Sequence, residues 1–189
     1  VWKPKNYTVN FHAENGKIDS ISTEYNSLIN ERMSNVEGYT FDGWYTDEGI
    51  KWNFNSDKVT ADLDLYARWS ANYYNVSFDT SDGTPVEVQR VMYGDTAKMP
   101  DSLPEKNQHK FINWNASNGL SGALLYSPET TWDFINNKIT KDTVVYAGYD
   151  INKYTVSFNS NGGTSIEQQV LDYGSTIYPI SSVLNGNTP

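Results

Sequence analysis

Alternating apolar and polar residues open three similar segments of the chain. Residues 7–11 read Tyr-Thr-Val-Asn-Phe, residues 74–78 read Tyr-Asn-Val-Ser-Phe, and residues 154–158 read Tyr-Thr-Val-Ser-Phe. A period of two residues is typical of a β-strand that turns one face toward a core. The pattern therefore predicts three equivalent strands. On the first of them, the inward face carries Tyr7, Val9 and Phe11.

A turn signal and a second strand follow each of these segments. The turns contain Asn-Gly at 15–16, Asp-Gly at 82–83 and Asn-Gly-Gly at 161–163. Asn, Asp and Gly tolerate the positive φ angles that hairpin turns require. Each repeat is therefore expected to open with a β-hairpin. The second strands are expected to end at Tyr25, Tyr93 and Tyr173.

Further motifs recur in the same order through the first two segments, as expected of a tandem repeat. The paired motifs are Phe-x-x-Trp at 41–44 and 111–114, Trp-x-Phe at 52–54 and 132–134, and a closing strand pattern at 65–69 and 145–149. The spacing between motifs widens in the second segment. This indicates a short insertion near 101–108 and a longer one at about 116–130.

The repeat pattern divides the chain into four parts. Residues 1–6 are expected to be the tail of a preceding repeat, because Trp2 precedes the first strand as Trp69 and Tyr149 precede the next two. The other predicted parts are 7–70 as repeat 1, 71–151 as repeat 2 with its insertion at about 116–130, and 152–189 as the first half of repeat 3. Both ends are expected to cut through a longer array.

The bulky aromatic residues that recur in both repeats are predicted to form the core. A unit of roughly 65 residues lies near the lower size limit for independent folding, and aromatic side chains raise the apolar area buried per residue. An exposed, sugar-binding aromatic platform is the alternative. In repeat 1 the recurring set consists of Phe11, Phe41, Trp44, Trp52, Phe54, Tyr66 and Trp69.

The link after each hairpin has a weaker pattern. Residues 27–36 carry Leu28, Ile29 and Met33 at loosely helical spacing, whereas the corresponding stretch of repeat 2 contains Pro100 and Pro104. Proline interrupts a helix because it lacks a backbone N–H. We expect one short helix or an irregular crossover in each repeat, followed by two or three further strands.

In their order, these motifs resemble the internalin B-repeat, also called the Listeria–Bacteroides repeat. Gly-Tyr-Thr-Phe-x-Gly-Trp-Tyr at 38–45 and Leu-Tyr-Ala-x-Trp at 65–69 carry the resemblance best. Repeat 2 departs from it at 109–114, where the sequence is His-Lys-Phe-Ile-Asn-Trp, and repeat 3 shows only the first half. The resemblance implies an α+β, mainly β fold of tandem β-grasp (ubiquitin-like) repeats arranged as an elongated array.

The same resemblance implies an extracellular place on the bacterial cell surface, mostly in Gram-positive bacteria. Attachment to the cell wall is expected to come from regions outside this sequence. In such proteins the repeats resemble stalk or interaction modules, which leaves two functions open here. The chain is expected to be a non-catalytic spacer, or else an adhesive module that binds a host surface protein or glycan. Neighbouring repeats of the same chain are also expected partners.

Composition narrows the range of partners. The formal net charge is −9, so phosphate backbones and anionic membrane surfaces are repelled, and nucleic acid is not an expected partner. No apolar run approaches the roughly 18 residues of a membrane-crossing helix, so no membrane insertion is expected. The chain has no cysteine, which excludes disulfides and thiolate zinc sites.

The residues offer little catalytic chemistry. His12 and His109 are the only histidines; they lie at non-equivalent places, and neither is expected to act as a general base. Neither a nucleophile elbow nor a phosphate-binding glycine loop occurs. Residues 79–83 faintly resemble a calcium loop but lack its spaced ligands, so a hairpin turn is favoured. We expect no enzyme activity, no cofactor and no metal. The acidic residues expected to be merely solvated are Asp47, Glu48, Asp62 and Asp64.

The insertion at about 116–130 is the strongest candidate for a specific contact. It carries apolar residues that are unusual for a loop, and loops on a rigid scaffold often carry function. These residues are Leu120, Leu124, Leu125 and Tyr126. The alternative is an insertion that folds back on its own repeat. The candidate partner-contact residues are Leu124, Leu125, Tyr126, Tyr39 and Tyr45.

Overall fold

The computed structural model describes residues 3–13, 16–120 and 122–179. The predicted strand at Trp2, part of the first hairpin turn and the predicted cut end of the array therefore lie outside the described residues. The chain divides into two compact units. The first consists of Val1–Asn75, Arg90–Ala97 and Lys138–Asp142, and the second consists of Val76–Gln89, Lys98–Asn137 and Thr143–Pro189.

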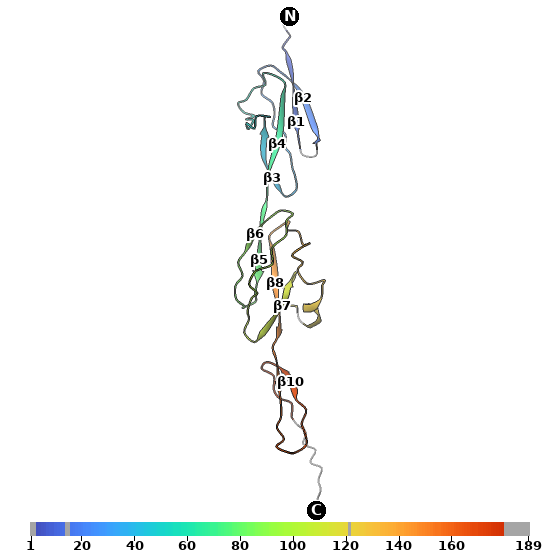
Figure 1. The fold of residues 1–189 in the computed structure, drawn as a ribbon. Coiled ribbons are helices and arrows are strands. Elements are labelled where there is room, and N and C mark those ends of the chain that lie inside the picture. The colour runs from blue at the N-terminus through green and yellow to red at the C-terminus, as the bar shows by residue number, and fades with distance from the viewer. Residues whose placement is uncertain (1–2, 14–15, 121, 180–189) are drawn as a thin grey trace, which may run out of the picture. The chain divides into compact units, whose positions relative to one another are not determined.

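The first repeat forms a four-stranded sheet with the order β2-β1-β4-β3 (Figure 1). Its strands are β1 (Asn6–His12), β2 (Ile18–Glu24), β3 (Tyr39–Tyr45) and β4 (Leu63–Ala71). The hairpin partners β1 and β2 are antiparallel, as predicted, while β1 and β4 are parallel in the centre of the sheet. A β-bulge interrupts the antiparallel pair β3–β4 between Phe41 and Gly43.

The second sheet repeats this arrangement with the order β6-β5-β8-β7. Its strands are β5 (Tyr73–Asp79), β6 (Gln89–Met92), β7 (His109–Asn115) and β8 (Thr143–Ile151). The central pair β5–β8 is again parallel, and the pair β7–β8 has its register shift between Phe111 and Asn113. The two sheets therefore agree in strand order, in the parallel direction of the central pair and in the position of the bulge.

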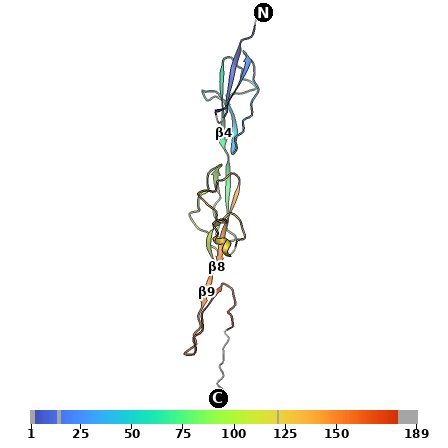
Figure 2. The ribbon, with the colours of Figure 1, turned by 90° about the vertical axis from the view of Figure 1, so that its right-hand side faces the viewer.

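A third hairpin follows the second sheet. It consists of β9 (Lys153–Val156) and β10 (Gln169–Asp172), which pair antiparallel, and β9 follows β8 after one residue (Figure 2). In the described part of the chain, helical structure is limited to short 3-10 turns such as η2 (Gly122–Tyr126). The crossover at 27–36 is irregular, and the fold is mainly β. Within the described ranges, no helix has the length and apolar composition needed to cross a bilayer.

Most of the recurring aromatic residues lie on the covered face of each sheet. Trp44 is 2% exposed and Trp114 is 1% exposed. Their rings meet Phe11 and Phe78 edge-on, at centroid distances of 4.9 Å and 5.0 Å. Trp52 and Trp132 are half-buried rather than solvent-exposed. The core interpretation of these tryptophans is therefore confirmed, as is the inward face of the first strand.

The core prediction is wrong for Tyr66, which is 40% exposed. Successive side chains on a strand point to opposite faces of the sheet. Leu65 is fully buried and Ala67 packs against the same core, so the residue between them must face away from it. On the outer face the Tyr66 ring stacks on the His12 ring at a centroid distance of 4.5 Å.

Candidate functional site

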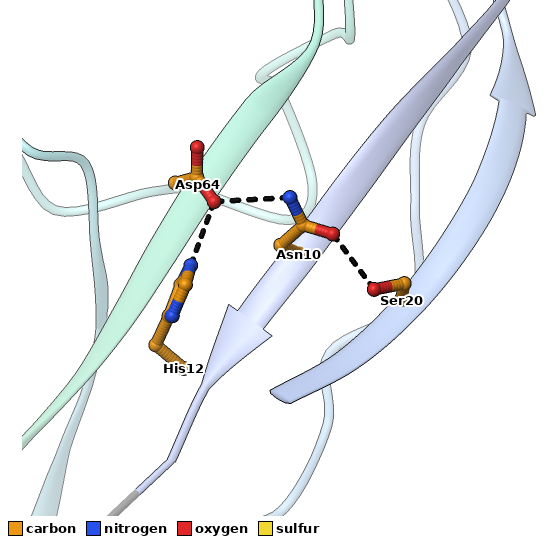
Figure 3. Close-up of polar contacts among 4 residues, drawn as sticks. All are labelled: Asn10, His12, Ser20 and Asp64. Atoms are coloured by element: carbon orange, nitrogen blue, oxygen red, sulfur yellow. Dashed lines mark hydrogen bonds and ion pairs between the residues drawn. The ribbon is translucent and has the colours of Figure 1, made fainter. Parts of the chain in front are cut away.

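Four polar side chains meet on the outer face of the first sheet (Figure 3). Asn10 and His12 come from β1, Ser20 comes from β2, and Asp64 comes from β4. Strand register brings them together, because Asn10 is the pairing partner of Ser20 in the hairpin and of Asp64 in the parallel pair. The cluster therefore spans three adjacent strands, of which β4 is far from the other two in the sequence.

Asp64 is the centre of this cluster. Its Oδ1 atom lies 2.6 Å from His12 Nε2 and accepts a hydrogen bond of 3.0 Å from Asn10 Nδ2. The hydrogen bond with His12, followed by that from Asn10, holds the pKa of Asp64 below its ordinary value of 3.8. The predicted solvated charge is thus exposed to water, but it also ties β4 to β1. Ser20 Oγ extends the cluster by donating to Asn10 Oδ1 at 2.7 Å.

The geometry of this cluster does not build a nucleophile. A catalytic triad needs the histidine nitrogen that faces away from the carboxylate to contact a hydroxyl group. Here the hydroxyl of Ser20 donates to the Asn10 amide and not to His12. The cluster is also absent from repeat 2, where Ser77, Asp79 and Val144 occupy the positions of Asn10, His12 and Asp64. These contacts join strands and favour a structural role.

A second acidic position recurs in both repeats. Asp62 Oδ1 accepts a hydrogen bond of 2.8 Å from the Thr8 backbone N–H, and Asp142 Oδ1 accepts one of 2.9 Å from the Asn75 backbone N–H. Each bond ties the start of one central strand to the segment before the other. Asp62 is therefore more than the solvated charge that the sequence pattern predicted. The recurrence of Thr-x-Asp at 60–62 and 140–142 was the signal that could have identified this role.

The turn at 79–83 has the hydrogen bonds of a polar turn. The Ser81 backbone N–H donates to Asp79 Oδ1 at 2.9 Å, and the Asn161 backbone N–H donates to Asn159 Oδ1 at the same distance in the third repeat. Ser81 and Asn161 both adopt positive φ angles, of 45° and 47°.

Among the residues that the structure describes, no group of three or more His, Asp or Glu side chains could hold a metal ion.

The insertion of repeat 2 folds back on its own repeat. Leu125 is 2% exposed, so its side chain anchors the insertion in the interior of repeat 2. The Asn113 amide donates to the Leu125 carbonyl and, at 3.0 Å, to Thr131 Oγ1. The Tyr126 hydroxyl donates to Asp150 Oδ2 at 3.0 Å, although the rest of this side chain is exposed.

The five candidate partner-contact residues form no single surface within either unit. Tyr39 and Tyr45 lie on β3 in the first unit, whereas residues 124–126 belong to the second. The Arg68 guanidinium lies over the half-buried ring of Tyr45, at 4.3 Å from its centroid. Leu124 and Tyr126 remain exposed on the insertion. A partner contact at Leu124, Tyr126, Tyr39 and Tyr45 stays a prediction. The Leu125 side chain is 2% exposed, so it is not available to a partner.

One residue separates the last strand of each repeat from the first strand of the next. Asn72 lies between β4 and β5. Its N–H donates to the Gly38 carbonyl at 2.9 Å, and its own carbonyl accepts from the Tyr93 N–H at 2.8 Å. The ring of Tyr93 covers Gly38 and lies 6.3 Å from the Tyr39 ring. This junction is therefore hydrogen-bonded on both sides.

The second junction repeats these hydrogen bonds within the second unit. Asn152 lies between β8 and β9; its N–H donates to the Gln108 carbonyl at 2.9 Å, and its carbonyl accepts from the Tyr173 N–H at 2.8 Å. Gln108 adopts a φ of 59° where Gly38 has 78°. The Tyr154 hydroxyl adds a bond of 2.9 Å to Gln108 Oε1. The same backbone hydrogen bonds therefore recur at both junctions.

Two similar sheets, a third hairpin of the same pattern and repeated junctions define a protein built from tandem β-repeat modules. The model of the Listeria-Bacteroides repeat domain matches residues 7–68, 74–148 and 154–185. The chain belongs to this family, and the resemblance to the internalin B-repeat is confirmed.

Relatives with similar sequences are much longer proteins. The chain is 37% identical over 180 residues to a putative membrane protein and 34% identical over 180 residues to a putative Gly-rich membrane protein, both of Evansella cellulosilytica. It is 35% identical over 152 residues to internalin H of Listeria monocytogenes. The matches cover 93%, 93% and 77% of this chain, but only 26%, 20% and 25% of the respective relatives.

Proposed function

We propose that this chain is a non-catalytic spacer segment of a bacterial cell-surface protein. The observation that carries the proposal is the single-residue junction. At Asn72 and at Asn152 the backbone is hydrogen-bonded through both its N–H and its carbonyl group, so no free linker separates one repeat from the next. A chain of folded modules without free linkers suits a stalk that holds another domain away from the cell.

The location follows from the relatives and from the chemistry of the chain. Two of the relatives carry names of membrane proteins and a third is an internalin, which favours an extracellular place at the cell surface. We infer that wall or membrane attachment comes from regions outside this sequence. A net charge of −9 keeps the modules soluble and disfavours contact with anionic polymers.

We infer that each complete repeat is a β-grasp sheet without its usual helix. The support is the strand order β2-β1-β4-β3 with a parallel central pair, which recurs as β6-β5-β8-β7. The irregular crossover at 27–36 occupies the place of the helix in repeat 1 and still supplies Ile29 to the core. An elongated array of such repeats is the arrangement that we expect.

The spacer role can be tested on intact cells with the full-length protein. Deletion of residues 74–153 removes one repeat in register and should reduce the access of an antibody to a tag placed before residue 1. Insertion of a second copy of residues 7–73 into this shortened protein should restore the access of the antibody. A spacer depends on its length and not on the identity of its modules. If the second copy fails to restore access in a protein that reaches the surface at normal levels, the spacer role is wrong.

An adhesive module is the second candidate function. It is favoured by the exposed side chains of Leu124 and Tyr126, which are 55% and 58% exposed on an insertion that repeat 1 lacks. The partner would be a host surface protein or a glycan. Saturable binding of the isolated chain to host cells, lost in Tyr126→Ala but kept in Tyr25→Ala, whose side chain is similarly exposed at 57%, would support this function. Binding that is equal for both variants would contradict it.

A further inference from the structure

Two tyrosine rings lie side by side at the base of the hairpin in every repeat. Their ring centroids are 6.3 Å, 6.5 Å and 6.2 Å apart, and their planes make angles of 53°, 56° and 57°. In each repeat the N–H of the second tyrosine also donates to the carbonyl of the residue just before the first strand, at 2.9 Å, 2.8 Å and 2.8 Å. These three equivalent surfaces consist of Lys5, Tyr7 and Tyr25; of Asn72, Tyr74 and Tyr93; and of Asn152, Tyr154 and Tyr173.

Two of the three surfaces hold a turn of the preceding repeat. Asn72 donates its N–H to the Gly38 carbonyl and Asn152 donates its N–H to the Gln108 carbonyl, each at 2.9 Å. Gly38 and Gln108 come just before β3 and β7 and adopt positive φ angles of 78° and 59°. Each of these contacts lies within a single unit. The surface therefore receives the carbonyl of a left-handed residue that precedes the third strand of a repeat.

The tyrosine side chains add to this backbone contact in a way that depends on the turn. At the first junction the ring of Tyr93 covers Gly38, and Tyr93 is half-buried. At the second junction the Tyr154 hydroxyl donates to Gln108 Oε1 at 2.9 Å, while Tyr173 remains 51% exposed. Burial of the second ring therefore accompanies a glycine in the turn.

The first repeat presents the same surface, and it is uncovered in the part of the chain that the structure describes. Lys5 accepts the Tyr25 N–H, but within the described residues its own N–H meets no acceptor. Tyr25 is 57% exposed, and the Lys5 ammonium group lies 4.8 Å from the centroid of the Tyr7 ring. The open donor and the exposed ring are equivalent to the two groups that hold Gly38 at the first junction.

We propose that Lys5, Tyr7 and Tyr25 form the docking surface for a preceding repeat of the same protein. A glycine turn like that of Gly38 lies under the Tyr25 ring, and its carbonyl accepts the Lys5 N–H. The two junctions within this chain identify this occupant, and the matched relatives are long enough to contain further modules. The inference rests on the proposed spacer function, because it extends the same hydrogen-bonded junction to one more repeat.

The experiment extends the chain by one repeat in register. A second copy of residues 5–71 is inserted between Pro4 and Lys5, so that the original Lys5 follows Ala71 as Asn72 does. Amide hydrogen exchange is followed by NMR, and the two Lys5 amides are assigned separately by the residue that precedes each. The Lys5 amide after Ala71 should exchange about tenfold more slowly, or slower still, than Lys5 in the unaltered chain. The Lys5 amide after Pro4 should exchange as it does in the unaltered chain.

The Asn72 amide separates failure of this inference from failure of the spacer function. It is hydrogen-bonded at the existing junction and should be protected in both proteins. If Asn72 is protected but neither Lys5 amide is, the docking surface is refuted and the spacer function keeps its support. An unprotected Asn72 amide in both proteins would contradict the inference and the spacer function together.

Two variants of the extended protein test the aromatic part of the surface. Tyr25→Ala in the original repeat should speed exchange of the Lys5 amide after Ala71 about two- to tenfold, because an aromatic contact is lost. Tyr126→Ala is the matched control, since Tyr126 is 58% exposed on the insertion of repeat 2, and it should leave this exchange unchanged. Unchanged protection in a folded Tyr25→Ala variant would overturn the role of the ring. If that variant does not fold, the comparison of the extended and unaltered chains still decides.

The unaltered chain is also measured at increasing protein concentration. The Lys5 amide should stay unprotected throughout, because the turn comes from a preceding repeat and not from another molecule. Protection that grows with concentration would mean that a second copy of the chain occupies the surface, and it would overturn the assignment.

Discussion

The ring of Tyr93 lies directly over Gly38, and no Cβ atom fits between them. Gly38 also adopts a φ of 78°, which side-chain-bearing residues rarely adopt. The Gly38 carbonyl accepts the N–H of Asn72, whose own carbonyl accepts the N–H of Tyr93. At the first junction, Gly38 therefore both accepts a backbone hydrogen bond and packs against the Tyr93 ring.

The Gly38→Ala substitution should strongly destabilise the first junction. The left-handed backbone costs alanine about 1–2 kcal/mol, and the clash with the Tyr93 ring adds about 1–3 kcal/mol. Urea unfolding followed by amide signals of β3 and β4 measures the change. Gly94→Ala is the matched control, since Gly94 has a φ of 81° but no atom within 4 Å of the added Cβ. It should show the backbone effect alone.

Removal of the ring should relieve the clash. In a Tyr93→Ala background, Gly38→Ala should be no more harmful than Gly94→Ala, because only the backbone effect remains. The difference between the two backgrounds measures the coupling of the pair. Equal effects of Gly38→Ala with and without the Tyr93 ring would show that the ring does not occupy this place.

The equivalent core tryptophans should respond differently to phenylalanine. Trp44 Nε1 donates to the Arg32 carbonyl at 2.8 Å, whereas the buried Trp114 Nε1 has no partner. Trp44→Phe should therefore lower the free energy of unfolding by about 1 kcal/mol more than Trp114→Phe does, since it removes a hydrogen bond. Denaturation followed by amide signals of β3 and β7 compares the two. A larger loss for Trp114→Phe would contradict the difference in bonding.

Acid should weaken the first repeat through Asp64. Its pKa is lowered in the folded state by the hydrogen bonds with His12 and Asn10. A depressed carboxyl pKa stabilises the fold above the ordinary value of 3.8, and this contribution is lost as the pH falls through the folded-state pKa. The effect should be small because Asp64 is largely exposed. Thermal unfolding from pH 6 to about pH 2 tests this, with a shallower acid dependence expected for Asp64→Asn.

Asp133 supplies the matched comparison for the acid experiment. Its pKa is lowered by the side-chain hydrogen bond of Asn136 and by backbone N–H groups of Ile135 and Asn136. Asp133→Asn should reduce the acid dependence of amide signals in the second sheet and leave that of β1 and β4 unchanged. If Asp64→Asn leaves the acid response of β1 and β4 as it was, the hydrogen bonds of Asp64 do not stabilise the fold.

Neighbouring leucines of the insertion should differ sharply in their effect on stability. Leu125→Ala removes a buried side chain and should lower the free energy of unfolding by about 2–5 kcal/mol. Leu124 is exposed, so Leu124→Ala should change it by less than about 0.5 kcal/mol. Thermal melting of both variants provides the measurement. Similar melting temperatures would mean that the insertion does not fold back on the sheet.

The repeats and their cores were predictable from the sequence because periodicity is a local signal. Alternation at 7–11 identified the inward face of β1, and recurrence identified Trp44 and Trp114 as core residues. Alternation also explains the error at Tyr66, since recurrence of an aromatic residue does not reveal its face of the sheet. The apolar neighbours of Tyr66 on β4, Leu65 and Ala67, indicate the inward face, and this alternation is a better guide to burial than the recurrence of an aromatic residue.

The contacts between distant strands were not predictable in the same way. The bond between Asp64 and His12 depends on the parallel register of β1 and β4, which no spacing in the sequence reveals. The burial of Asn115 depends on Gly148 and on how the insertion folds back. The replacement of Tyr45 and Arg68 by Asn115 and Gly148 was visible in the aligned repeats, but their contact was not.

Small-angle X-ray scattering of a series of lengths tests the spacer account most directly. The series contains the chain without residues 74–153, the chain itself, and the chain with a second copy of residues 7–73. The account predicts that the maximum dimension grows by a similar increment with each added repeat, and that Tyr93→Ala broadens the distance distribution. A maximum dimension that stays constant as repeats are added would contradict it.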